Sequence, residues 1–189
     1  AFLDTQSSDT PFLMVIATPA AHAPFESAPQ YNNTAGNQTS PRTPNWNNVQ
    51  VNNANKHQLM TVVPEMEQEA ITQSDWTWRF RLGCLKSVDD IVESIVHRLE
   101  DQENGLDIDN TYFIYTSDHG FHLGQYGMMY DKRQLYENDI RIPFVIRGPG
   151  VPKNTTTDQF ALNIDIAPTI VDIATGKIPD VFDGMSLKP

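Results

Sequence analysis

The chain has 189 residues with 13 basic and 24 acidic side chains, which gives a formal net charge of −11 at pH 7. This balance argues against non-specific binding to nucleic acid or to an anionic membrane, and an anionic substrate would need a local cationic site. The single cysteine, Cys84, excludes an internal disulfide and a Cys-rich zinc site. No apolar run approaches the ~20 residues of a membrane span.

The first predicted element is a buried strand. "PFLMVIAT", from Pro11 to Thr18, is a continuous apolar run bounded by turn-forming residues, as in strands buried on both faces. From Pro19 to about Asn55 the composition shifts to Pro, Asn, Ala and Thr, which indicates a long loop. Long loops in compact domains tend to be functional or mobile, and this one carries His22 between two prolines in "TPAAHAPF".

A helix is predicted next. The pattern is helical between Glu65 and Glu100. After Ser87, apolar residues recur regularly at spacings of three and four, and the narrower prediction is one amphipathic helix from about Val88 to Glu100. Ser87 and Asp90, three residues apart, resemble a capping box in which Asp replaces Glu. Cys84 then falls in the preceding linker and is interpreted as a structural thiol.

The second half of the chain alternates strands and a helix. "TYFIYTS" (Thr111 to Ser117) and "IPFVIRG" (Ile142 to Gly148) are predicted as buried strands. "NIDIAPTIVDIAT" has the features of a helix start, with Asp165 as a possible cap and Pro168 suited to the first turn. Strands alternating with helices indicate an α/β fold with a largely parallel sheet.

Several polar side chains follow the predicted strands. In a parallel sheet, ligands gather at the C-terminal ends of the strands, where His22 and the stretch from Ser117 to His122 would both lie. Asp118 offers a hard carboxylate oxygen suited to Ca²⁺ or Mg²⁺, and His119 could bind a metal or an anion. The alternative is an Asx turn with an exposed histidine.

Lys132 and Arg133 supply the positive charge that an oxyanion such as sulfate or phosphate requires, although a solvated Lys-Arg pair is the commoner meaning of such a dipeptide. The convergence of the segments that carry His22, Asp118 and Lys132 favours a site. Weaker candidates are Lys56-His57 and His122. His97 is interpreted as a solvated helix residue.

The pattern Asn-x-Ser/Thr occurs in polar segments at Asn32, Asn37 and Asn154. These triplets predict N-glycosylation and a secretory route, although Asn-rich loops also produce them by chance.

Together these residues resemble the sulfatase family. The resemblance rests on "YTSDHGFHLGQ", "DKRQLYE", "IRIPFVIRGPG", "NIDIAPTIVDIA" and "DGMSL" in that order, with "TPAAHAPF" upstream and "SVDDIVESIVHRLE" between, and it covers nearly the whole chain. Within the family, the N-acetylglucosamine-6-sulfatases are most similar, and the extracellular heparan sulfate 6-O-endosulfatases are near relatives.

The resemblance implies an alkaline-phosphatase-like α/β fold, with a mostly parallel sheet flanked by helices, and hydrolysis of a sulfate ester near Ca²⁺ and a formylglycine nucleophile. Asp118 and His119 match the second pair of calcium ligands, with His119 in place of the Asn of many members. His22 and Lys132 match residues that contact the sulfate group, and we include His122 among the expected substrate-binding residues.

The sequence departs from the family pattern in its nucleophile. Sulfatases carry the formylglycine precursor in a Cys-x-Pro-Ser-Arg type motif and further calcium ligands in an early Asp-Asp pair. Cys84 lacks the proline and arginine of that motif, and Asp89-Asp90 falls on a predicted helix, so neither is assigned to the site. We therefore expect residues 1–189 to be the middle and C-terminal part of a sulfatase catalytic domain, incomplete at both ends, and inactive alone.

Three functions stay open at this point. The first is a segment of a lysosomal or secreted calcium-dependent sulfatase that acts on N-acetylglucosamine 6-sulfate or on sulfated glycosaminoglycans, with exo action preferred. The second is a non-catalytic module that binds sulfated glycans. The third is a phosphatase or phosphodiesterase of the same superfamily, which bound zinc would favour.

Overall fold

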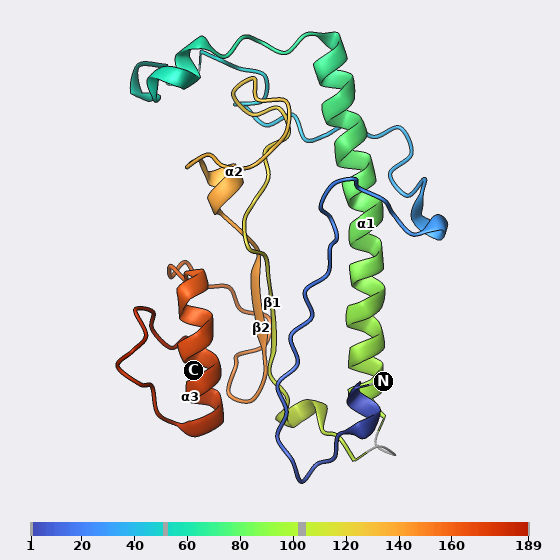
Figure 1. The fold of residues 1–189 in the computed structure, drawn as a ribbon, viewed down its shortest axis with the longest axis vertical. Helices are drawn as coiled ribbons and strands as arrows, with labels where there is room; N and C mark the ends of the chain where they lie inside the picture. Colours follow the sequence, from blue (N-terminus) through green and yellow to red (C-terminus); the bar gives the residue numbers. More distant parts are fainter. Residues whose placement is uncertain (1, 51–52, 102–104, 189) are drawn as a thin grey trace. The chain divides into compact units, whose positions relative to one another are not determined.

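The computed structural model describes residues 2–50, 53–101 and 105–188, which form two compact units. The first unit comprises Ala1–Ile108 and His119–Ile142, and the second comprises Asp109–Asp118 and Pro143–Pro189. The chain therefore passes from the first unit to the second and back again before it ends in the second, as the colours of Figure 1 show. Among the described residues no helix is both long and apolar enough to cross a membrane.

The first unit is built along the helix α1, Gln68–Glu100. Its sequence is rich in helix-forming residues and has no proline, and its last turn contains His97 and Arg98, which suit the negative end of the helix dipole. The helical pattern predicted between Glu65 and Glu100 is confirmed, whereas the narrower prediction of one helix from about Val88 was wrong at its N-terminal end, because α1 begins twenty residues earlier. Ser87 is accordingly no cap but lies inside the helix.

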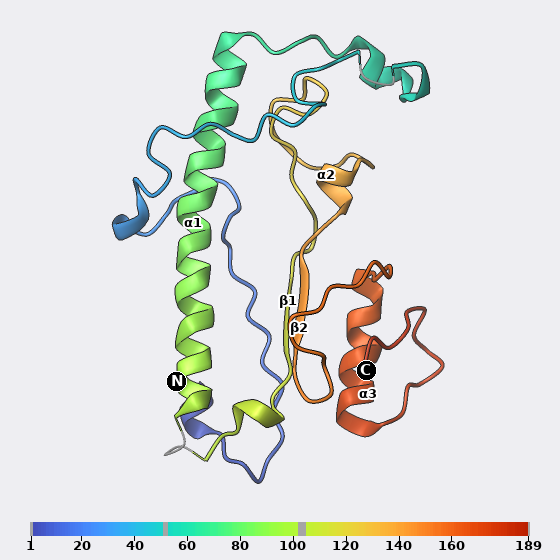
Figure 2. The same ribbon diagram turned by 180° about the vertical axis from the view of Figure 1, so that it is seen from behind.

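The loop that precedes α1 packs along it. Figures 1 and 2 both show the N-terminal segment, in blue, running beside the helix. Gly83 allows part of this approach, because a Cβ atom there would lie 2.9 Å from both the Cβ of Ser27 and the carbonyl oxygen of Tyr31. Cys84 is buried at 2% exposure in the same stretch of helix, not in a linker as predicted. Burial raises the pKa of its thiol.

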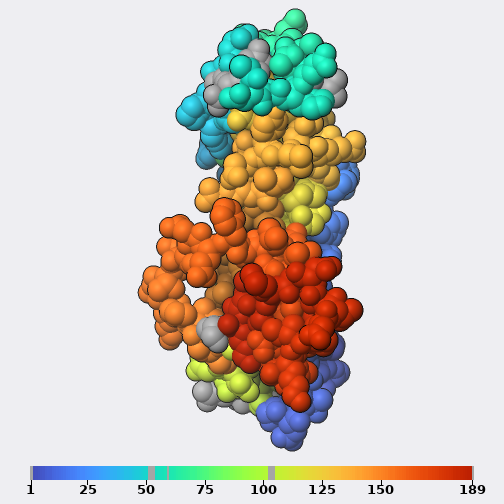
Figure 3. Space-filling view, turned by 90° about the vertical axis from the view of Figure 1, so that its left-hand side faces the viewer, coloured from blue at the N-terminus to red at the C-terminus, as the bar shows by residue number. Residues whose placement is uncertain are grey.

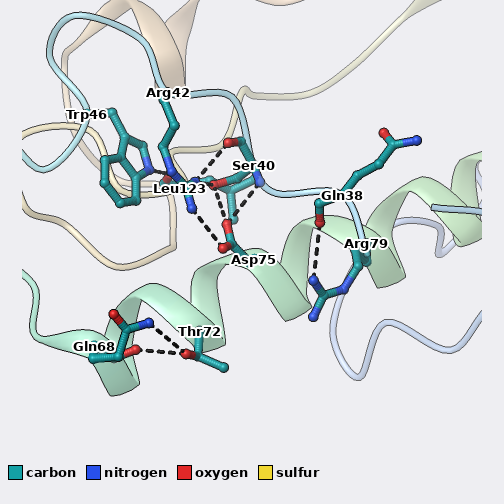
Figure 4. Close-up of polar contacts among 9 residues, drawn as sticks. All are labelled: Gln38, Ser40, Arg42, Trp46, Gln68, Thr72, Asp75, Arg79 and Leu123. Carbon is teal, nitrogen blue, oxygen red and sulfur yellow. Dashed lines mark hydrogen bonds and ion pairs between the residues drawn. The ribbon is translucent and has the colours of Figure 1, made fainter. Parts of the chain in front are cut away.

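Polar contacts fix the irregular loop to α1, as Figure 4 shows. The carboxylate of Asp75 accepts hydrogen bonds from the backbone nitrogen of Ser40 at 2.9 Å and from its hydroxyl at 3.0 Å. Arg42 donates to the other carboxylate oxygen at 2.7 Å and lies 3.8 Å from the centroid of the Trp46 ring. Trp46 in turn donates to the carbonyl of Leu123 at 2.9 Å, so one network joins three segments of the first unit.

The apolar run from Pro11 to Thr18 is not a strand. It has no regular secondary structure, and Leu13, Val15 and Ile16 are exposed. A buried strand needs neighbours that pair with its backbone, and within the part of the chain that the structure describes this run has none.

The second unit contains a two-stranded sheet and a helix. Strand β1, Phe113–Thr116, pairs with β2, Phe144–Arg147, in the register Phe113↔Arg147 to Thr116↔Phe144. Both strands were predicted, but as buried strands, whereas Tyr115 of β1 and Val145 of β2 are exposed. The pair is also antiparallel, which corrects the expectation of a parallel arrangement for these strands.

Helix α3, Ile166–Thr175, follows as predicted, with Pro168 in its first turn. The side chain of Asp165 makes no capping hydrogen bond to the helix, although a cap was predicted there. Its carboxylate instead accepts hydrogen bonds from the backbone nitrogens of Leu162 and Met185, both at 2.8 Å. In Figure 3 the C-terminal residues, in red, form one continuous patch on the face in view.

Candidate functional site

The turn after β1 carries Asp118, the last residue of the first segment of the second unit. Its side chain is exposed, and one carboxylate oxygen lies 3.4 Å from the hydroxyl of Ser117. The amide of Asn163 donates to the carbonyls of Ser117 at 3.4 Å and Asp118 at 3.2 Å. Asn163 thus supports the backbone below the predicted metal ligand, a role that the sequence analysis missed.

His119 begins the segment that returns to the first unit. Its Nδ1 lies 2.7 Å from the carbonyl oxygen of Gly120. Because a carbonyl can only accept a hydrogen bond, this contact places a proton on Nδ1, and a neutral ring then carries its lone pair on Nε2.

Gly120 is required by the close approach of a short helix, α2, Glu137–Ile140. The nitrogens of Gly120 and Phe121 donate to the carbonyls of Asp139 and Asn138, both at 2.7 Å. A Cβ atom at Gly120 would lie 2.1 Å from the carbonyl oxygen of Asn138. Glycine is therefore required at this position because the backbone of α2 packs closely against it, and not because of a left-handed turn.

A cluster of three aromatic rings brings the predicted segments of the first unit together. Phe25 is 7% exposed, and its ring centroid lies 6.4 Å from those of both Phe121 and Tyr130. Phe121 and Tyr130 stack on one another, also at 6.4 Å. These rings follow His22 by three residues, follow His119 by two and precede Lys132 by two, so the aromatic cluster gathers the three segments around one point.

Arg81 of α1 completes the aromatic cluster. Its guanidinium lies 3.8 Å from the centroid of Phe121 and donates a hydrogen bond of 2.6 Å to the carbonyl of Ala21, the residue before His22. Burial lowers the pKa of Arg81 from its ordinary value. The sequence analysis did not single out Arg81, because its partners are a backbone carbonyl and a ring that are distant in the sequence.

His22 lies in a tight turn. Its backbone nitrogen donates to the carbonyl of Pro19 at 2.8 Å, and its own carbonyl accepts from Phe25 at 3.0 Å. Phe25 has a φ of 62°, an unusual conformation for a bulky residue. The Nδ1 of His22 lies 3.0 Å from the carbonyl of Ala23, which again assigns the proton to Nδ1. His22 would therefore have to be an imidazolium to donate a proton through Nε2.

His122 is buried at 4% exposure and pairs with Asp139, which is equally buried. Its Nδ1 lies 2.9 Å and 3.1 Å from the two carboxylate oxygens. Lys132 is half-buried in the loop that follows the bridge between His122 and Asp131. The roles predicted for His122 and Lys132 in binding a substrate stay predictions.

The donor chemistry fits calcium in part. A carboxylate oxygen such as that of Asp118 is a ligand that Ca²⁺ prefers, whereas the imidazole nitrogen of His119 is not. Among the described residues, no group of three or more His, Cys, Asp and Glu side chains could hold a metal ion. A calcium site that uses Asp118 would therefore need further oxygen ligands.

The remaining candidates have structural contacts. Lys56 donates to the carbonyl of Val49 at 2.8 Å and lies 4.8 Å from the centroid of Tyr126. Asp90 accepts hydrogen bonds from the hydroxyl of Tyr31 at 2.7 Å and 2.9 Å, and this interaction raises the pKa of Tyr31. His97 is exposed on α1. The three predicted glycosylation sites, Asn32, Asn37 and Asn154, are exposed as well.

Comparison with known proteins gives one consistent result. The model of the sulfatase family matches residues 1–177. The chain is 46% identical over 190 residues to the N-acetylglucosamine-6-sulfatase of Capra hircus and 45% identical to that of Homo sapiens, and each alignment covers 100% of this chain and 33% of the relative. It is 38% identical over 184 residues to the extracellular sulfatase SULF-1 homolog of Drosophila melanogaster, covering 97% of this chain and 16% of the relative.

A solved structure shows the same fold. A protein in complex with its substrate D-glucosamine-2-N,6-O-disulfate superposes with a TM-score of 0.76 at 24% sequence identity, over 100% of this chain and 49% of that one. The expected alkaline-phosphatase-like sulfatase fold is confirmed, with the antiparallel pair β1–β2 as its described sheet. The chain spans about a third of the length of the N-acetylglucosamine-6-sulfatases that it matches. With the family model matched over residues 1–177 and this fold in place, the chain belongs to the sulfatase family.

Proposed function

We propose that this chain is part of a calcium-dependent sulfatase that hydrolyses 6-O-sulfate esters of N-acetylglucosamine in heparan or keratan sulfate. The observation that carries the proposal is the aromatic cluster of Phe25, Phe121 and Tyr130, which gathers the segments bearing His22, His119 and Lys132. The identity of 45–46% to N-acetylglucosamine-6-sulfatases supports this choice of substrate.

The residues of the chain have complementary chemistry for a sulfate ester. The ammonium group of Lys132 would bind a sulfate oxygen and offset negative charge that develops in the transition state. His22, protonated on both ring nitrogens, would donate through Nε2 to the sulfate or to the leaving oxygen of the sugar. Arg81 would hold the turn of His22 through the carbonyl of Ala21.

Calcium and the nucleophile complete the proposal. Asp118 would hold calcium through a carboxylate oxygen, with His119 as its predicted neighbour in the ligand set, and the ion when bound would stabilise negative charge on the sulfate. The formylglycine nucleophile is expected outside these residues, because Cys84 is buried in α1 and the sequence after it is Leu-Lys-Ser. Residues 1–189 alone should therefore not turn over aryl sulfates.

The test uses the full-length gene product with N-acetylglucosamine 6-sulfate as substrate. Replacing Lys132 with Ala should lower kcat/KM by on the order of a hundredfold, since it removes one charge-assisted contact worth roughly 2–4 kcal/mol in a site that partly excludes water. Arg133→Ala is the neighbouring control and should cost much less. A folded Lys132→Ala enzyme with most of its catalytic efficiency would contradict the role of Lys132.

The alternative is a module that binds sulfated glycans without cleaving them. Full-length protein that binds heparan sulfate but releases no sulfate, with or without added calcium, would favour this alternative. Activity that exhaustive chelation removes and calcium restores would favour the enzyme. We place the protein in the lysosome or outside the cell, which the exposed glycosylation triplets and the extracellular relative of Drosophila support.

A further inference from the structure

We propose that His122 and Asp139 are positioning residues that hold the turn of Lys132 in shape, and that His122 itself does not touch the substrate. This inference rests on the proposed role of Lys132 and deepens it. The pair is buried in the first unit, whereas Lys132 lies in the loop between the two partners.

The contacts form a closed ring around the Lys132 turn. At one end, the backbones of His122 and Asp131 exchange two hydrogen bonds, of 2.9 Å and 3.4 Å. At the other end, the nitrogen of Gln134 donates to Oδ2 of Asp139 at 2.8 Å. The imidazole of His122, 2.9 Å from Oδ1 of Asp139, closes the ring. Lys132 and Arg133 are thus the two residues held between fixed ends.

The backbone inside this ring is strained. Arg133 has a φ of 102°, a conformation that residues with a side chain rarely adopt and that glycine adopts readily. Such a conformation persists only where the surrounding contacts impose it. The bond from Gln134 to Asp139 is directly next to Arg133, so the carboxylate is the group best placed to impose it.

The position of His122 fits this role better than contact with a substrate. Its Nδ1 is used by Asp139, and its side chain is only 5% exposed. Asp139 is held from its other side as well, because its carbonyl accepts the hydrogen bond of Gly120 at 2.7 Å. The His122–Asp139 pair therefore links the backbone of Gly120 to the turn of Lys132.

The test combines two substitutions in the full-length gene product. Asp139→Asn should lower kcat/KM by about ten- to a hundredfold, because a small displacement of Lys132 is costly in catalysis. Arg133→Gly alone should lower kcat/KM far less than Asp139→Asn, since Arg133 is exposed and glycine adopts the observed φ without strain. Adding Arg133→Gly to Asp139→Asn should raise kcat/KM at least roughly threefold above that of Asp139→Asn alone. The weakened ring of contacts then no longer has to hold a side-chain-bearing residue at a positive φ.

Glu137→Gln is the matched control: it removes the same charge from the same short helix, but its side chain is 76% exposed. It should leave kcat/KM unchanged. A double variant no better than Asp139→Asn, or a Glu137→Gln variant as poor as Asp139→Asn, would overturn the proposal.

A second measurement separates this inference from the proposed function. Amide hydrogen exchange of the peptide that spans residues 131–135 should rise in Asp139→Asn and stay at the wild-type level in Glu137→Gln, whatever the activity of the protein. A wild-type protein without sulfatase activity would refute the proposed function, but the exchange result would still decide whether the ring holds the turn. Unchanged hydrogen exchange of residues 131–135 in Asp139→Asn would refute the proposal that the ring of contacts holds this turn.

Discussion

At the scale of single residues, Gly120 shows how a short motif can be dictated by packing. A methyl group there would meet the carbonyl of Asn138 at 2.1 Å, and that carbonyl already accepts the hydrogen bond of Phe121. Gly120→Ala should therefore destabilise the protein by about 1–3 kcal/mol, since the backbone of α2 must move. Urea denaturation measures this change.

Gly36→Ala is a useful comparison for Gly120→Ala. Gly36 has a φ of 51°, and no atom lies within 4 Å of the position that an added methyl group would take. Gly36→Ala should therefore lower the free energy of unfolding by roughly 1 kcal/mol, through the unfavourable backbone conformation alone. Equal losses in the two variants, with α2 unshifted, would show that the space at Gly120 is larger than the structure indicates.

The residues predicted from the sequence were those whose chemistry is visible in a short motif, such as Asp118, His119 and Lys132. The residues whose roles the sequence analysis did not identify were Arg81, Asp139 and Asn163. Each of them acts on a backbone group or a ring far away in the sequence, so no local spacing reports it. Supporting residues of this kind need the fold before they can be recognised.

At the scale of elements, α1 depends on the network of Asp75. Burial raises the pKa of Asp75, but the hydrogen bonds from Arg42 and Ser40 outweigh it and hold that pKa below its ordinary value. The network should therefore stabilise the fold fully above about pH 4, the unfolded value of an aspartate, and lose this contribution as the pH falls through the lowered pKa.

Arg42→Ala tests the network. Because Asp75 keeps the two bonds from Ser40, we expect a loss of about 2 kcal/mol in the free energy of unfolding at pH 7, and a smaller difference from wild type at acid pH. Arg79→Ala is the control, since this arginine makes one exposed bond of 3.1 Å to the carbonyl of Gln38, also drawn in Figure 4. Denaturation curves from pH 3 to 7 measure both.

The elements also show where periodicity is a good guide. The spacing of three and four predicted the helical pattern from Glu65 to Glu100 and the start of α3. It gave a regular amphipathic series only after Ser87, because the buried residues in the first half of α1 include the polar Ser74, Asp75 and Thr77. Strand direction was not readable either, because an apolar run is the same for parallel and antiparallel partners.

At the scale of the whole molecule, the three Asn-x-Thr triplets bear on the route by which the protein is made. Asn32, Asn37 and Asn154 are all exposed, so a chain that enters the secretory pathway should carry glycans there. Protein secreted from a eukaryotic host should lose mass on treatment with an N-glycosidase. Replacing each Asn with Gln should remove one glycan at a time, whereas an unchanged mass would remove the secretory argument.

The engagement of Arg42 also determines where a protease can cut. To enter the specificity pocket of trypsin, Arg42 would have to leave Asp75, the carbonyl of Ser40 and the ring of Trp46. Arg141 has a side chain that is 83% exposed, and the bond after it should be cut before the bond after Arg42, although it borders a helix. Limited trypsin digestion followed by mass spectrometry should therefore show that the irregular segment around Arg42 resists cleavage in the native chain, even though it lacks regular secondary structure.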